Sequence, residues 1–306
     1  MKSASRLEKV LNAGEFAVTA ELGPPTNADA EVIRKKASYC RGFVDGVNIT
    51  DNQTAVVRMS SIGAAAIAID EGLEPIVQMV CRDRNRIAMQ SDILGAAAIG
   101  VKNLLCLSGD HQSFGNHPQA AGVYDIDSVQ MVNMVKRMRD EKEFLSGDPI
   151  KDNEPRLFIG AVENPFADPF EYRVIRLAKK IEAGADFIQT QCVFDIEKFE
   201  QWMELVVKEG LHEKVYILAG LTPVRSPRAL SYIKNNVAGM SVPDELIERM
   251  EKAEDPKAEG VKICLETIER IRKIKGVTGI HLMPIGWESI TSSILEQADL
   301  LPRPEL

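Results

Sequence analysis

Side chains able to do acid–base chemistry stand directly after short apolar runs of this 306-residue chain. Glu21 follows the mostly apolar residues 17–20 and precedes Gly23-Pro24-Pro25, a turn whose prolines restrict the backbone. A carboxyl group held there acts as a general acid if its surroundings disfavour its charge. The alternative is an ion pair with a neighbouring Lys or Arg. We therefore take Glu21 as a candidate proton donor.

A second group, Ser108-Gly109-Asp110, follows the apolar run 104–107. Glycine lets the backbone approach a flat or phosphorylated ligand closely. Asp110 would then hydrogen-bond that ligand or bias its charge. An ordinary turn with Asp110 as a helix cap is the alternative interpretation.

Amide side chains form a third group, since Gln189 and Gln191 share one face if residues 186–193 form a strand. Buried amides need hydrogen-bond partners, which a pterin or flavin ring offers. A polar layer satisfied by water or neighbouring side chains is the alternative, and we expect it less because the flanking strand is apolar. Weaker candidates are Thr50-Asp51-Asn52 and Glu163-Asn164-Pro165, which end other apolar runs, and Gln78, which lies within one.

The elements that must position these groups alternate in type. Eight short apolar segments predict buried strands, at 16–22, 45–50, 74–81, 103–108, 156–163, 186–193, 214–222 and 279–285. Helical patterns lie near 29–42, 54–71, 84–99, 126–142, 169–183, 196–208, 226–236 and 257–274, with extra helices at 243–253 and 287–298. This alternation favours an α/β fold, a single (β/α)8 barrel, over a doubly wound sheet.

Polar residues at strand ends fit such a barrel, whose active site lies at the carboxyl ends of its strands. Two longer loops interrupt the rhythm. Residues 111–125 follow a strand and are expected on the catalytic face, whereas residues 143–155 precede a strand and are expected on the opposite face. Arg176, Lys179 and Lys180 fall in a helix, where a solvated face is the simplest interpretation.

Composition excludes several classes of protein. A net charge of −8 argues against a general nucleic-acid binder. No signal peptide or bilayer-spanning run is apparent, so we expect a cytoplasmic enzyme without membrane insertion. The five cysteines are widely spaced, which predicts reduced buried thiols, and the four histidines show no metal spacing, so we expect no metal. His281 lies in an apolar run and is expected to be a satisfied core residue. No Rossmann or P-loop glycine pattern is present.

Taken together, these segments resemble the methylenetetrahydrofolate reductase family, over nearly the whole chain. The matching segments are Ala20-Glu21-Leu22-Gly23-Pro24-Pro25, Val47-Asn48-Ile49-Thr50, Leu107-Ser108-Gly109-Asp110, Glu182-Ala183-Gly184-Ala185-Asp186 and Thr190-Gln191-Cys192-Val193-Phe194-Asp195. The resemblance implies one flavin-binding barrel domain over 1–306, with non-covalent FAD at the carboxyl ends of the strands. It also implies the reduction of methylenetetrahydrofolate to methyltetrahydrofolate, or the reverse.

The same resemblance implies roles for individual residues. Glu21 would protonate the departing folate nitrogen, Asp110 would act near the flavin and the pterin, and Gln191 and Trp287 would bind folate. The positions matching flavin contacts are Thr50, Gln78, Ser108, Gly109, Asp110, Asn164, Lys179 and Lys180.

Some positions depart from the NADH-dependent members of that family. Gln78 stands in place of a His, Ser108 and Trp287 in place of Arg, and Ala229 and Ile233 in place of a Gln and a stacking Phe. Loss of stacking surface disfavours direct NADH use. We therefore expect electrons from a partner subunit or complex, with a homo-oligomer also compatible. The alternatives are an NAD(P)H-dependent enzyme acting alone, a non-catalytic flavin- or folate-binding subunit, and an unrelated barrel lyase.

Overall fold

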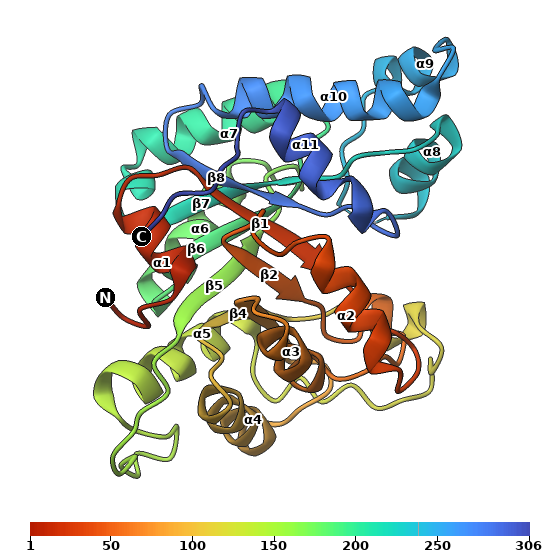
Figure 1. Cartoon of the computed structure of the whole chain (residues 1–306). Coiled ribbons are helices and arrows are strands. Elements are labelled where there is room, and N and C mark those ends of the chain that lie inside the picture. The colour runs from red at the N-terminus through yellow and green to blue at the C-terminus, as the bar shows by residue number, and fades with distance from the viewer. Residues whose placement is uncertain (238) are drawn as a thin grey trace.

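The computed structural model describes residues 1–237 and 239–306, and its centre is a closed barrel of parallel strands in chain order, β1 to β8 (Figure 1). Each strand is short and almost wholly buried, as expected for strands covered by helices on one side and packed inside a barrel on the other. The expected (β/α)8 barrel is confirmed. The strands are Ala17–Leu22, Gly46–Ile49, Pro75–Val80, Asn103–Leu107, Phe158–Glu163, Phe187–Cys192, Tyr216–Leu221 and Val277–Leu282.

Helices lie between the strands close to the expected positions. They are α1 Arg6–Asn12, α2 Ala30–Ser38, α3 Ser61–Asp70, α4 Arg86–Ala98, α5 Ser128–Lys136, α6 Tyr172–Ala183, α7 Ile196–Lys208, α8 Pro227–Asn236, α9 Asp244–Glu251, α10 Pro256–Ile271 and α11 Thr291–Gln297. The helix expected over 54–71 is wrong in its first part, because α3 begins only after its N-cap Ser60, whose hydroxyl accepts from Gly63 N–H. In its place, Gln53–Ala55 form a single short 3-10 turn, and residues 56–60 belong to no helix.

The barrel interior changes from apolar to polar along its axis. At the amino-terminal end, Leu7 and Val10 of α1 pack against Ile76, Leu105 and Phe187 of the strands. Nearer the carboxyl ends lies a polar layer of Thr19, Asn48, Gln78, Gln189 and His281, all at most 9% exposed. The fold therefore closes one end with α1 and leaves a polar surface facing the other.

Two buried aspartates fasten the amino-terminal ends of neighbouring strands. The carboxylate of Asp45 accepts from Val18 N–H and pairs with Arg303, which also donates to the carbonyl oxygen of Phe16. On the other side of the barrel, the carboxylate of Asp186 accepts from Ile159 N–H and pairs with Arg139, which donates to the carbonyl oxygen of Leu157. Each arginine therefore joins two consecutive strands, away from the polar mouth.

The two long loops lie at opposite ends of the barrel, as expected. Residues 111–125 contact the turn after β2, where Val57 N–H donates to Asn116 Oδ1 at 3.2 Å. Residues 143–155 approach Ser3 and Lys102 at the amino-terminal end. Both chain ends lie at that end too, with Arg6 donating to the carbonyl oxygen of Pro304.

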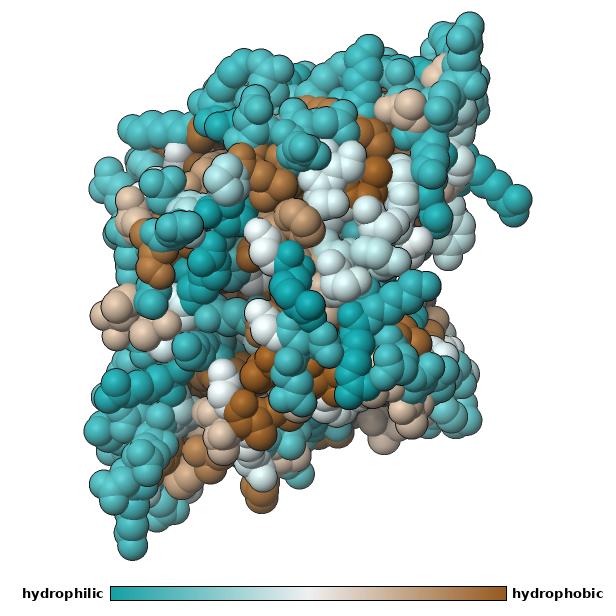
Figure 2. All heavy atoms as spheres, viewed as in Figure 1, coloured by the Kyte–Doolittle hydropathy of each residue, from teal (hydrophilic) through white to brown (hydrophobic). Residues whose placement is uncertain are grey.

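Hydrophilic side chains cover most of the side shown in Figure 2, and apolar side chains reach it in patches between them. Among the described residues, no helix combines the length and apolarity needed to cross a bilayer. The five cysteines are buried and unpaired, which confirms the expectation of buried free thiols.

Candidate active site

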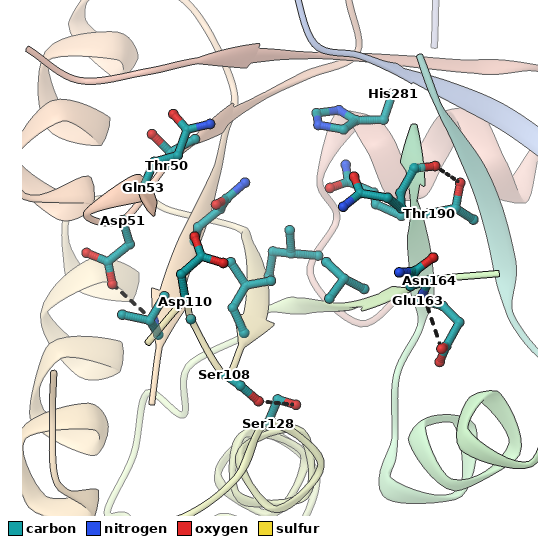
Figure 3. A pocket seen from close by; sticks show the side chains of 18 of the residues that line it. Thr50, Asp51, Gln53, Ser108, Asp110, Ser128, Glu163, Asn164, Thr190 and His281 are labelled. Atoms are coloured by element: carbon teal, nitrogen blue, oxygen red, sulfur yellow. Dashed lines mark hydrogen bonds between the residues drawn. The ribbon is translucent and has the colours of Figure 1, made fainter. Parts of the chain in front are cut away.

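A pocket of about 430 Å³ opens at the carboxyl ends of the strands. Figure 3 shows Thr50, Gln53 and Asp110 on one side of it and His281, Thr190 and Asn164 on the other. Most of the predicted site residues meet here. The lining includes Glu21, Thr50, Gln78, Ser108, Gly109, Asp110, Asn164, Lys180 and Gln191.

Glu21 lies near the end of β1 and lines the pocket, where its side chain is partly exposed. Burial raises the pKa of Glu21 to about 7, while a 3.4 Å hydrogen bond from Gln53 Nε2 opposes that rise. The nearest cations are engaged elsewhere, since Lys36 pairs with Glu288 and Arg58 donates to the carbonyl oxygen of Pro24. In the described part of the chain, Glu21 therefore makes no ion pair, and a carboxyl group with this pKa carries a proton at neutral pH part of the time.

Arg82 organises the turn that carries Asp110. Its buried guanidinium donates to the carbonyl oxygens of Asp110 at 2.8 Å and Asn52 at 3.3 Å, and it pairs with Asp83. Gly109 has φ +84°, and a Cβ there would meet Val80 at 3.0 Å. The turn is thus fixed through its backbone, which leaves the exposed Asp110 carboxylate without a capping bond among the described residues.

In the turn after β2, the side chain of Asp51 is fully hydrogen-bonded, whereas the hydroxyl of Thr50 has no partner in the described structure. The Asp51 carboxylate accepts from Val80 N–H at 3.0 Å and pairs with Arg84, so it holds β2 to β3. Thr50 is 2% exposed, yet its Oγ1 has no hydrogen-bond partner in the described structure. A buried hydroxyl without a partner is costly, and this one belongs to a pocket-lining residue.

Gln189 is satisfied by protein, which corrects the preference for a ligand at that position. Its amide exchanges two hydrogen bonds with the amide of Asn48, at 2.6 and 3.0 Å, and also donates to Thr19. After Gln189 the pairing of β6 with β7 shifts: the three-residue step from Gln189 to Cys192 in β6 lies opposite a two-residue step in β7. This bulge interrupts the alternation just at Gln191, which lines the pocket and is partly exposed.

His281, predicted to be a satisfied core residue, is buried but also lines the pocket. Its Nδ1 lies 2.9 Å from Thr19 Oγ1. Burial lowers the pKa of His281 to about 3, so the ring is neutral near pH 7.

The basic residues of α6 separate into two environments, which corrects the single solvated face expected for them. Lys180 is buried beside Glu163, with 2.7 Å between Nζ and Oε2, and burial lowers its pKa although Glu163 opposes this. Arg176 lines the pocket, and no ion pair of its side chain is found among the described residues. Lys179 is exposed and lies outside the lining, so a phosphate-binding role there stays a prediction.

Trp287 also lies outside the described pocket lining. It is 9% exposed, and Arg225 and Lys257 lie over its ring at 5.9 and 5.1 Å from the centroid. Its predicted folate contact stays untested.

Sequence reasoning did not single out Arg82 and Gln53, which both line the pocket. Arg82, which follows the third predicted strand, could have been flagged as a charged residue at a strand end. Gln53 could not, because it lies in a left-handed turn without glycine that the sequence did not indicate. Within the described residues, no three metal-binding side chains converge.

Comparison with known proteins gives a consistent result. Residues 6–299 match a family model described as methylenetetrahydrofolate reductase. A protein of Caenorhabditis elegans named probable methylenetetrahydrofolate reductase (NADPH) is 23% identical over 81% of this chain, which spans only 36% of that relative. The 5,10-methylenetetrahydrofolate reductase of Pectobacterium carotovorum is 23% identical over 94% of this chain and 92% of its own length.

One solved structure, an uncharacterized protein from Clostridium thermocellum, superposes with a TM-score of 0.64 at 17% identity, covering 96% of this chain and 98% of its own. Its description states that it binds two copies of 5-methyl-5,6,7,8-tetrahydrofolic acid. At this identity the likeness supports the barrel fold.

Proposed function

The chain belongs to the methylenetetrahydrofolate reductase family, and from this premise we propose that it interconverts 5,10-methylenetetrahydrofolate and 5-methyltetrahydrofolate with bound FAD. The observation that carries the proposal is Glu21, a pocket carboxyl group whose pKa is raised to about 7 by burial. A proton donor of that strength suits the opening of a methylene bridge between two nitrogens. The folate bound by the Clostridium thermocellum protein supports the same class of substrate.

The pocket residues fit a flavin. Thr50 Oγ1 is a buried hydroxyl that needs a partner, Gln78 adds an amide, and Gly109 brings backbone close to the cavity. Arg176 supplies a cation for a phosphate group, whereas Lys180 is already engaged by Glu163. Bound reduced FAD would supply the hydride that converts the methylene carbon to a methyl group.

The chain's own residues would prepare the folate for that transfer. Glu21 donates its proton to the departing folate nitrogen and thereby makes the carbon a better hydride acceptor. The Asp110 carboxylate, fixed by Arg82 through the backbone, stabilises the resulting positive charge. Gln191 holds the pterin, since its partly exposed side chain lines the pocket. Ser108, Asn164, Lys179 and Trp287 remain predicted ligand contacts.

We further propose that a partner subunit or complex supplies the electrons. The support is the apolar, non-aromatic character of Ala229 and Ile233, which pack beside Leu230 of α8. NADH oxidation by the isolated chain at a rate typical of the family would contradict this part alone. Direct use of NAD(P)H would then be the better assignment.

The decisive test uses the absorption spectrum of the purified chain, with FAD added back where needed. A flavin spectrum that bleaches anaerobically with methyltetrahydrofolate is expected. Glu21→Gln should keep flavin and folate binding but slow bleaching by at least about 100-fold, while Glu204→Gln on the exposed face of α7 should behave as wild type. Flavin and folate binding without bleaching would indicate a non-catalytic subunit, and failure to bind either would reject the proposal.

A further inference from the structure

The turn after β2 has an unusual backbone. Asn52, Thr54 and Ala55 all have positive φ, at 45°, 57° and 56°. None is glycine, and a β-branched residue such as Thr54 is rarely found there. Such strain persists only where surrounding contacts enforce it, and it concentrates at functional sites.

Contacts from several directions hold this turn in place. Arg82 donates to the carbonyl oxygen of Asn52 at 3.3 Å, and the Asn52 side chain accepts from Arg58 N–H at 3.0 Å. Ala55 N–H donates back to the carbonyl oxygen of Asn52 at 2.9 Å. The one residue of the turn with an ordinary φ is Gln53, whose amide reaches Glu21 Oε1 at 3.4 Å.

The loop of residues 111–125 presses on the same turn from outside. A Cβ on Gly115 would lie 1.8 Å from the carbonyl oxygen of Ala55, a contact that only glycine permits. Asn116 accepts from Val57 N–H and adds a second link between the two segments. Gly115 has an extended backbone, with φ −101° and ψ −165°, so its closeness to Ala55 and not its own conformation requires glycine.

We propose that Gln53 is a positioning residue for Glu21, held against it by the strained turn that Gly115 supports. A role for Gln53 in catalysis rests on the proposed function, whereas its effect on the pKa of Glu21 can be measured without that function. The Gln53 N–H group favours the carboxylate form, and it orients the carboxyl group toward the pocket it shares with Gln191. The other groups that act on Glu21 are Glu288, Lys36 and Arg58, and Cys192 of β6 faces it.

The experiment measures the pKa of Glu21 directly, without ligand, by carbon NMR of protein labelled at glutamate, with the signal assigned by its absence in Glu21→Gln. Gln53→Ala and Gln53→Met both remove the donor, but the first admits water and the second excludes it. The pKa should rise in both variants, by roughly 0.4 to 1 unit. A rise in only one variant, or in neither, would overturn the proposal.

The role of Gly115 is tested in the same way. Gly115→Ala should raise the pKa of Glu21 in the wild-type background and leave it unchanged in the Gln53→Ala background, because both substitutions remove the same contact. Gly95→Ala, at an exposed position of α4 where a Cβ meets nothing within 4 Å, is the matched control. An equal rise in both backgrounds would show that Gly115 acts on Glu21 by another route. These titrations stand even if the chain proves unable to reduce folate, since they need no turnover.

Discussion

The guanidinium of Arg82 donates to the backbone carbonyl oxygen of Asp110 at 2.8 Å, and so joins the third strand to the turn that follows the fourth. The same group reaches Asn52 in the turn after β2. One buried side chain therefore sets the relative positions of the turn beside the candidate acid and the turn carrying the second candidate carboxylate.

Replacement of this arginine by lysine should loosen both turns, because an ammonium group cannot make the forked set of bonds. We expect Arg82→Lys to lower the free energy of unfolding by about 1.5 to 3 kcal/mol, as for lost hydrogen bonds to a charged group, and to weaken FAD binding. Urea unfolding and flavin titration measure the two effects. Arg86→Lys, on an exposed pair with Asp125, is the control and should change neither; equal behaviour of the two variants would argue against a special role for Arg82.

The unsatisfied hydroxyl of Thr50 gives a second prediction. Valine has the same shape without the hydroxyl, so Thr50→Val should stabilise the flavin-free protein by about 1 kcal/mol and weaken FAD binding. Thr291→Val is a matched control, since Thr291 is also buried with an unpartnered Oγ1 but lies in α11, outside the pocket lining. Thr291→Val should therefore stabilise the protein without changing FAD binding. Unchanged flavin affinity in Thr50→Val would remove this hydroxyl from the cofactor site.

Glu21 predicts how stability depends on pH. Its folded pKa of about 7 lies above the ordinary 4.5, so the folded state holds the proton more tightly and its stability falls as pH rises from 4.5 to 7. The total amounts to at most about 3 kcal/mol. Glu21→Gln stays neutral, and should therefore gain stability relative to wild type across that window. Urea unfolding at several pH values measures this, and parallel curves for the two proteins would contradict it.

His281 predicts the opposite slope. Its folded pKa of about 3 lies below the ordinary 6.5, so the unfolded chain binds the proton first and stability falls as pH drops below 6.5. We expect His281→Gln to reduce this loss by up to about 1.4 kcal/mol per pH unit between pH 6 and 4. His117→Gln, an exposed substitution in the loop of residues 111–125, should leave the slope unchanged. An acid slope that survives in His281→Gln would assign it to other groups.

The alternation of buried strands and helices was enough to predict the barrel, since each element's burial pattern is local to its own residues. The pairing of Gln189 with Asn48 was not predictable, because the two residues come from strands far apart in the sequence. The same holds for Lys180, whose helix position suggested solvent until the fold placed it against Glu163. Gln53 escaped detection for a different reason: its turn is maintained by contacts from Arg82 and Gly115, and not by its own residue types.

The aspartate–arginine pairs at the closed end of the barrel have a further consequence. Arg139 comes from the connection between β4 and β5, and it binds the residue before β5 and the aspartate before β6. Arg303 makes the equivalent contacts before β1 and β2, but it comes from the segment after β8. Because β5 and β6 lie four strands away from β1 and β2 in this closed ring of eight, a half-turn about the barrel axis carries one aspartate–arginine pair onto the other. The segment after β8 thus occupies the place that an eighth connection, from β8 back to β1, would fill, and the twofold pattern is complete where β8 pairs with β1.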